Sequence, residues 1–220
     1  MGKNYNRRTE KDYGLLRKAF YKSFLFFLVG PVAKLMYNLK IEGRENLPEG
    51  SRFIYAGNHV SYLDPPLLTY AVGGRFIAYM AKKELFYSDN VVLRTLVRWL
   101  GAFAVNRDKP EIATFKSVQA VFNSKGWALG IFPQGGIRKE DKIENIHKGF
   151  VLFAKKFKAD IIPVAICGYD GYAKKLFEKH LTMKIGKPIS HELPDDEIVK
   201  TWVRTICEFT GQTPGDEYLD

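Results

Sequence analysis

A histidine and an aspartate five residues apart are the side chains best suited to acid–base chemistry in this sequence. His59 is one of four histidines, and it lies with Asp64 in the segment GNHVSYLDPP. A carboxylate that holds an imidazole in one tautomer makes that ring a general base, because it also stabilises the imidazolium that forms. Asp64 precedes Pro65, so it also fits a helix N-cap before a first-turn proline, and the two roles are compatible.

The sequence lacks the motifs of common protein nucleophiles and catalytic metal sites. It contains no G-x-S-x-G, no HExxH and no G-x-x-x-x-G-K-[ST] loop. Its two cysteines, Cys167 and Cys207, are 40 residues apart without a CxxC, which predicts neither a disulfide framework nor a zinc site and fits a reducing cytoplasmic setting. The remaining chemistry is that of a base which activates a hydroxyl group of the substrate itself.

Three further segments combine glycines or polar side chains with basic residues after predicted strands. Arg107 ends GAFAVNR, the segment FPQGGIRKED contains Gln134, Gly135 and Arg138, and HKGF contains Lys148. Glycine-rich loops expose backbone N–H groups, and an arginine or lysine beside them can hold a phosphate. Each segment by itself is equally compatible with a plain turn that carries surface charge.

The elements that must position these residues alternate along the chain from Leu39 onward. We predict strands at 39–42, 53–56, 75–80, 102–106, 128–132, 161–166 and 182–185, and helices at 65–72, 90–100, 111–125, 149–157 and 195–209. This alternation predicts a single α/β domain over residues 39–210, with a mostly parallel or mixed central sheet flanked by helices. Pro163 predicts a strand end or an irregular edge, and residues 211–220 a flexible tail.

The charge of the chain indicates an anionic partner. The net charge is +10 over 220 residues, and the first 40 residues contain nine Lys or Arg against two Asp or Glu. Such a distribution fits a nucleic acid, an anionic membrane or a phosphorylated substrate, although it fits a solubilising surface equally well. We expect no nucleic-acid partner, because the sequence has no recognition-helix, zinc or RNP-type motif.

Residues 1–38 are predicted to form basic, aromatic helices that contact a membrane. Four apolar side chains fall at helical spacing on one face: Leu16, Phe20, Phe24 and Phe27. Gly30-Pro31 predicts a break between two short helices. No uncharged run exceeds 12 residues, whereas a membrane-spanning helix needs about 20. We therefore expect an amphipathic segment that lies in the interface without crossing it; a helix packed on the domain core is the alternative.

Four sequence blocks occur in the order and spacing of a known enzyme family. NHVSYLD, GAFAVNR, FPQG and IIPVAI, between Ile41 and Ile166, resemble the NHxxxxD, GxxFxxR, FPEG and [VI]PVxI patterns of the glycerolipid acyltransferases. The resemblance implies transfer of a fatty acyl chain from a thioester, on coenzyme A or acyl carrier protein, to the free hydroxyl of 1-acylglycerol-3-phosphate. The product would be phosphatidate, in phospholipid biosynthesis.

The same resemblance assigns roles to individual residues. His59 would be the general base, Asp64 would orient it, and Arg107 would bind the acceptor phosphate. The other substrate-binding candidates are Asn58, Gln134, Gly135, Arg138 and Lys148. The family uses no metal ion or other cofactor, so the implied partners are the lysophospholipid, the thioester donor and an anionic membrane surface. The implied location is the cytoplasmic face of the cell membrane, as a peripheral or monotopic protein.

The third block departs from the family pattern. Gln134 stands where the family has Glu, and Gly136-Ile137 replaces Thr-Arg, so that Arg138 comes one residue late. Glutamine keeps hydrogen-bonding capacity but loses the charge. Two alternatives to phosphatidate synthesis therefore stay open: acyl transfer to another lysolipid acceptor, and a non-catalytic lipid-binding protein.

Overall fold

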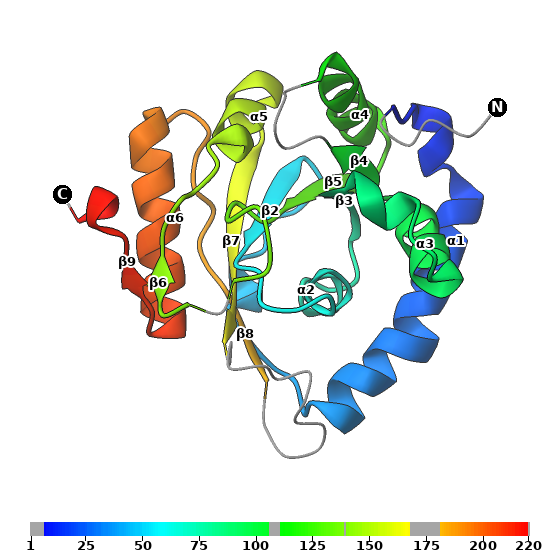
Figure 1. Cartoon of the computed structure of the whole chain (residues 1–220), viewed down its shortest axis with the longest axis horizontal. Helices are drawn as coiled ribbons and strands as arrows, with labels where there is room; N and C mark the ends of the chain where they lie inside the picture. The colour runs from blue at the N-terminus through cyan, green and yellow to red at the C-terminus, as the bar shows by residue number, and fades with distance from the viewer. Residues whose placement is uncertain (1–6, 106–110, 139, 168–180, 220) are drawn as a thin grey trace.

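A seven-stranded sheet forms the centre of the molecule, which a computed structural model describes over residues 7–105, 111–138, 140–167 and 181–219 (Figure 1). Its strands are β1 (Lys40–Glu42), β2 (Phe53–Gly57), β3 (Phe76–Lys82), β4 (Phe103–Val105), β5 (Trp127–Ile131), β7 (Asp160–Cys167) and β8 (Thr182–Ile185), in the order β1-β8-β7-β2-β5-β3-β4. All neighbours are parallel except β7 and β8, which are antiparallel. The predicted mostly parallel α/β sheet is thus confirmed.

Helices cover both faces of this sheet. They are α2 (Asp64–Ala71), α3 (Val91–Trp99), α4 (Ile112–Asn123), α5 (Gly149–Phe157) and α6 (Asp195–Thr210), and Figure 1 shows α6 on one flank and the N-terminal helix on the other. Alternate residues of a strand point to opposite faces, so Ile54 and Tyr55 of β2 enter different core clusters. Every strand and helix predicted from residue 39 onward has ends within two residues of those of an observed element.

Pro163 does not mark a strand end, because it lies inside β7, between β8 and β2, but the pairing on its β8 side is irregular as expected. Two residues earlier, Ile161 exchanges both backbone hydrogen bonds with Ile189, and the Pro163 carbonyl accepts one from the N–H of Gly186. The side of Pro163 that lacks a donor therefore faces the chain between Gly186 and Ile189, just after β8 has ended. An interior strand tolerates proline here because no ladder bond is required at that point.

The C-terminal residues also differ from the expected flexible tail. Thr213–Pro214 forms β9, which pairs with β6 (Lys142–Ile143) in a separate two-stranded sheet. The buried side chain of Gln212 donates to the carbonyl of Glu140 at 2.6 Å. This short sheet joins the end of the chain to the loop that follows the FPQG block, so the tail is ordered on the domain.

The N-terminal helix does not break at Gly30-Pro31. Helical structure runs from α1 (Leu15–Phe24) to Met36, and Gly30 and Pro31 keep right-handed helical φ angles of −59° and −58°. The segments on either side, 25–29 and 32–36, are π-helical, and the Gly30 N–H donates to the Leu25 carbonyl five residues earlier. The wider π turn lets the chain pass proline without ending the helix.

One face of this helix packs on the domain and the other is exposed. The buried residues recur every fourth position: Tyr21, Leu25, Val29, Ala33 and Tyr37. The exposed face includes Phe26, Phe27 and Leu35, each about three-quarters exposed. The alternative reading, a helix packed on the domain core, therefore holds for one face of the helix, while the other face is apolar and exposed. Residues 15–36 are, by length and composition, the one described helix that could cross a membrane. The expectation that the N-terminal segment is too short to span a bilayer therefore no longer holds.

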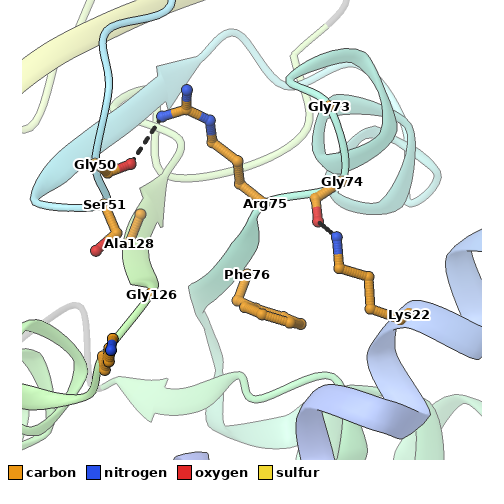
Figure 2. Close-up of a pocket in the computed structure, with 10 residues that line it drawn as sticks. Lys22, Gly50, Ser51, Gly73, Gly74, Arg75, Phe76, Gly126 and Ala128 are labelled. Carbon is orange, nitrogen blue, oxygen red and sulfur yellow. Dashed lines mark hydrogen bonds between the residues drawn. The ribbon is translucent and has the colours of Figure 1, made fainter.

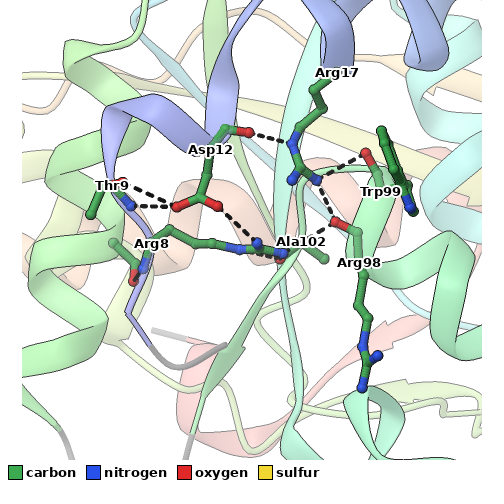
Figure 3. Close-up of polar contacts among 8 residues, drawn as sticks. Arg8, Thr9, Asp12, Arg17, Arg98, Trp99 and Ala102 are labelled. Carbon is green, nitrogen blue, oxygen red and sulfur yellow. Dashed lines mark hydrogen bonds and ion pairs between the residues drawn. The ribbon is translucent and has the colours of Figure 1, made fainter. Parts of the chain in front are cut away.

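An arginine cluster ties the start of this segment to the rest of the domain (Figure 3). Arg8 is buried and donates to the Ala102 carbonyl and to the Asp12 carboxylate, while Arg17 donates to the carbonyls of Asp12, Arg98 and Trp99. Burial alone would raise the pKa of Asp12, but the Thr9 N–H and the Arg8 guanidinium outweigh it and lower that pKa. The cluster fixes the N-terminal helix against the end of α3 and the turn into β4.

Candidate active site

His59 and Asp64 meet at the carboxyl end of the central strand β2. Their side chains are joined at 2.6 Å between Nδ1 of His59 and Oδ2 of Asp64. The same carboxylate oxygen accepts the backbone N–H groups of Val60 and Ser61, at 2.6 and 2.8 Å. Asp64 is fully buried and is the first residue of α2, so its carboxylate closes the preceding turn. The N-cap expectation for Asp64 is therefore wrong.

Aromatic rings hold the imidazole on its other side. The His59 ring stacks on Phe132 at 4.2 Å between centroids, and Phe132 stacks on Tyr79 at 5.7 Å. The Tyr79 hydroxyl donates to the Pro65 carbonyl at 3.0 Å, and burial raises the pKa of Tyr79 well above its ordinary value, so the hydroxyl stays protonated. Nδ1 faces Asp64, so Nε2 is the nitrogen of His59 available to a substrate; among the described residues it has no hydrogen-bond partner.

The FPQG block supports the backbone around His59. Gln134 is buried, and its Oε1 accepts the backbone N–H of His59 at 3.2 Å. The His59 carbonyl in turn accepts the backbone N–H of Arg138 at 2.7 Å. Gly135 has φ +70°, and a Cβ there would lie 2.5 Å from the His147 ring, so only glycine fits. This loop thus holds the backbone of His59 in place through its N–H and carbonyl groups.

The predicted substrate-binding residues do not all face the same space. Gly135 and Lys148 line a cavity with His59, whereas Asn58, Gln134 and Arg138 are not among its lining residues. Both polar atoms of the Asn58 side chain bond to the backbone of Ile166 in β7, at 2.7 and 3.0 Å, which gives Asn58 a positioning role at the strand ends. Arg107 lies outside the described residues.

A largely apolar cavity of about 770 Å³ extends from His59 between the N-terminal helix, α2, α3, α4 and α5. Its apolar wall includes Phe24, Leu28, Leu93, Leu96, Leu100, Phe115, Leu152 and Phe153. Such a volume is in the range of small-molecule sites. His147 and Lys82 also line it, although neither was among the predicted site residues. The HKGF segment was a usable signal for His147, since it follows the FPQG loop.

The arrangement is suited to base-catalysed acyl transfer in an apolar environment. Among the residues that the structure describes, neither serine nor cysteine lines the cavity, so no such nucleophile is placed to form a covalent acyl intermediate there. Over the same ranges, no three His, Cys, Asp or Glu side chains gather in a group that could hold a metal ion. What the cavity offers is the oriented base His59 beside space for an alkyl chain.

Comparisons with known proteins identify relatives of this chain. A model of the acyltransferase family matches residues 38–167. The 1-acyl-sn-glycerol-3-phosphate acyltransferase of Bacillus subtilis is 32% identical over 159 residues, which cover 72% of this chain and 77% of that protein. The Streptococcus pneumoniae enzyme of the same name is 27% identical over 76% of this chain and 63% of its own length.

A solved structure has the same fold. The crystal structure of the 1-acyl-sn-glycerophosphate acyltransferase from Thermotoga maritima superposes with a TM-score of 0.67 at 23% identity. The superposition covers 88% of this chain and 80% of the other. The α/β sheet and its flanking helices are therefore shared between the two proteins.

Proposed function

The chain belongs to the acyltransferase family, and from this premise we propose that it transfers a fatty acyl group from a thioester to the free hydroxyl of 1-acylglycerol-3-phosphate. The observation that carries the proposal is the oriented His59–Asp64 pair at the wall of the apolar cavity. The names of the relatives support this acceptor, and the product would be phosphatidate.

The proposed reaction needs one base and no covalent enzyme intermediate. Nε2 of His59 removes the proton of the acceptor hydroxyl while the oxygen attacks the thioester carbonyl carbon. The new C–O bond forms first, the C–S bond then breaks, and the leaving thiolate takes the proton from the imidazolium. The Asp64 carboxylate stabilises that imidazolium through Nδ1–H, and the cavity keeps water away from the thioester.

Basic side chains would hold the acceptor phosphate. We propose Arg107 for this role, together with Lys148, which lines the cavity at the start of α5. Lys148 pairs with Asp196 at 2.7 Å, and this hydrogen bond raises the pKa of Lys148, so the ammonium is charged. Both groups of the pair are largely exposed, so a phosphate can displace Asp196 at small cost.

An assay of thiol release tests the proposal directly. The protein would be given acyl-coenzyme A or acyl carrier protein as donor, with lysophosphatidate and other lysolipids as acceptors, and the lipid product identified. Release that requires lysophosphatidate and forms phosphatidate is the expected result. Release with a different lysolipid alone would assign the alternative acceptor, and no release with any pair would favour a lipid-binding protein without catalysis.

Gln134→Glu is expected to change acceptor choice. Glutamate keeps an oxygen that can accept the His59 N–H, but it adds a negative charge at a position that is only 3% exposed. We expect the ratio of kcat/KM between lysophosphatidate and other lysolipids to shift by several-fold to about tenfold, on the order of 1 kcal/mol. Gln134→Met, which removes the acceptor oxygen without adding charge, is the matched control. An unchanged ratio in Gln134→Glu would remove this residue as a determinant of specificity.

We also propose that the exposed face of the N-terminal helix lies on a membrane. Phe26 and Phe27 are 74% and 75% exposed, although aromatic side chains usually lie inside a soluble domain. Neighbouring turns contribute exposed Leu35 and partly exposed lysines such as Lys18. An apolar strip with basic residues beside it fits an interface with an anionic leaflet, on the cytoplasmic side of the cell membrane.

Phe26→Ser with Phe27→Ser should release the protein from vesicles. Each fully inserted aromatic ring contributes roughly 1.5–3 kcal/mol, so the double variant should bind roughly 10²–10⁴-fold more weakly in vesicle sedimentation. High salt alone should release the parent only partly, because ring burial is insensitive to salt. Phe24 is unsuitable for this test, since it also lines the cavity.

The matched control places serine at two exposed apolar positions elsewhere, Ile112 and Leu219. It should sediment like the parent. Equal sedimentation of parent and Phe26/Phe27 variant at every salt concentration would contradict membrane contact by this face.

A further inference from the structure

A second cavity of about 430 Å³ lies at the edge of the sheet opposite the base (Figure 2). Its wall includes Ser51, Phe76 and Gly126, which come just before or at the start of β2, β3 and β5. His59 and Phe132, by contrast, follow the carboxyl ends of β2 and β5. None of the described lining residues is common to the two cavities, so this one is separate from the proposed acyl-transfer site.

Positive charge gathers around this second cavity without a counter-charge. Lys22, Arg75 and Lys125 line it, and the Nζ atoms of Lys18 and Lys22 lie 5.3 and 5.2 Å from the centroid of the Phe76 ring. None of its described lining residues is acidic. Within the described ranges, none of these four cations forms an ion pair with a carboxylate, whereas Lys142, Lys148 and Lys155 each do.

Three of these cations, Lys18, Lys22 and Arg75, donate hydrogen bonds to backbone carbonyl groups of described residues. Lys22 donates to Gly74 at 2.9 Å, and Arg75 donates to Gly50 at 3.0 Å and to Pro48 at 2.7 Å, as Figure 2 shows for the two glycines. Lys18 donates to the Lys125 carbonyl. These bonds hold the ammonium and guanidinium groups in place but leave their charge uncompensated. A fixed group of cations around a hollow is suited to an anion.

Glycines leave the backbone of the cavity open to a ligand. Gly50, Gly73 and Gly126 have φ angles of +92°, +81° and +81° and turn the chain at the rim. A Cβ on Gly50 or Gly73 would meet no other atom within 4 Å, so the space beside them is empty of protein. A bulky anion such as a phosphate ester can approach there without displacing a side chain.

The N-terminal helix indicates which phosphate ester fits. Lys18, Lys22 and Phe26 follow one another at intervals of four and therefore lie on one face of the helix. Lys22 lines the cavity, the Lys18 ammonium lies over the Phe76 ring of its wall, and Phe26, one turn further, is 74% exposed. A basic stretch followed by an apolar one along a single face matches a phospholipid, with its phosphate at the lysines and its chains along the phenylalanine.

We propose that this cavity binds the phosphate group of an anionic phospholipid that is not itself a substrate, and that this lipid seats the N-terminal helix in the membrane. The proposal rests on the proposed membrane contact of that helix but not on acyl transfer. Its ligand is held by Lys18, Lys22 and Arg75 at the edge of the sheet opposite His59.

The first test compares two double variants of equal charge. The full-length protein would be sedimented with phosphatidylcholine vesicles that contain phosphatidylglycerol. Lys18→Gln with Lys22→Gln should weaken binding roughly 10–30-fold, as expected for two lysines near a lipid phosphate. Lys11→Gln with Lys34→Gln removes two exposed lysines of the same segment that do not line the cavity, and should weaken binding much less. Equal loss in both double variants would overturn the proposal.

The second test introduces a negative charge without removing a cation. Ser51→Asp places a carboxylate among the cavity residues, where it would compete with the lipid phosphate, and Ser51→Asn is the neutral control of the same size. We expect Ser51→Asp to bind phosphatidylglycerol vesicles about tenfold more weakly than Ser51→Asn, on the scale of one charge at the membrane surface. Circular dichroism and thermal unfolding verify that the variants fold. Equal binding of Asp and Asn variants would overturn the proposal.

Two further arms identify the source of the anion. In vesicles with cholesteryl hemisuccinate in place of phosphatidylglycerol, the net negative charge is carried by a carboxylate and not by the phosphate of an anionic phospholipid, and on them Ser51→Asp should differ little from Ser51→Asn. Inorganic phosphate at constant ionic strength should not displace the parent from phosphatidylglycerol vesicles. Displacement by phosphate that depends on Lys18 and Lys22 would assign the site to a soluble phosphate ester and overturn the lipid proposal. Loss of vesicle binding in Phe26→Ser with Phe27→Ser tests the helix contact separately, and thiol release in detergent micelles tests acyl transfer separately.

Discussion

His59→Ala is expected to lower kcat by about 10²–10⁴-fold, the usual contribution of a positioned general base. The imidazole is held on one side by Asp64 at 2.6 Å and on the other by the Phe132 ring, which leaves Nε2 to meet the acceptor hydroxyl. Alanine removes the only group in the described lining that is both oriented by a carboxylate and able to accept a proton at this position. The KM values should change much less than kcat, because the base acts mainly in the transition state.

A second histidine–aspartate pair provides the matched control for this variant. Nδ1 of His191 lies 2.7 Å from Oδ1 of Asp160, at the beginning of β7 and therefore at the opposite edge of the sheet from His59. His191→Ala should keep turnover within a few-fold of the parent in the thiol-release assay. A folded His59→Ala protein that retained more than a tenth of the activity would contradict the role of His59 as base.

Asp64→Asn should also lower kcat by at least about 100-fold while leaving both KM values nearly unchanged. The amide has nearly the same shape as the carboxylate, but it is neutral and does not stabilise the imidazolium. Asp64 is fully buried behind the histidine, and it is not among the residues that line the cavity, so its loss should not affect substrate affinity directly. The split between kcat and KM distinguishes a positioning residue from one that binds substrate.

The Asp64 variants need a measurement of stability beside the kinetics. The carboxylate oxygen accepts two backbone N–H groups as well as the histidine, so Asp64→Ala leaves the Val60 and Ser61 donors without this partner. We expect a cost of about 1–3 kcal/mol in the free energy of unfolding for each donor left unsatisfied. Asp64→Asn should lose less, because its Oδ1 can still accept one of them. An asparagine variant with kcat within tenfold of the parent would show that the charge of Asp64 is dispensable.

The sequence by itself determined the α/β architecture and the order of the elements. Strands buried on both faces appear as short apolar runs, and helices as longer amphipathic stretches, because the two structures bury side chains with different periods. The blocks NHVSYLD and FPQG could be placed just after strands for the same reason. Parallel strands place their carboxyl ends at one edge, so the neighbourhood of His59 and Gln134 follows from this pattern.

Several local expectations failed where a distant segment supplies the missing partner. Pro163 is tolerated in an interior strand because Gly186 and Ile189 complete the local hydrogen bonding. Gly30-Pro31 stays helical because the turns around it are π-helical and the buried stripe of the helix packs on the domain. The end of the chain is ordered because β9 finds β6, a strand of only two residues that no periodicity can reveal.

Only the tertiary structure decided the roles of the polar residues and the extent of the two cavities. Asn58 and Gln134 were predicted to contact substrate, yet their side chains bond to the backbone of Ile166 and His59. The apolar cavity takes its wall from five helices that are far apart in the chain, and the basic cavity combines Lys22 with Arg75 and Lys125. Residue type and spacing determine what a side chain can do, but its partners are set by packing between segments distant in sequence, which no local pattern contains.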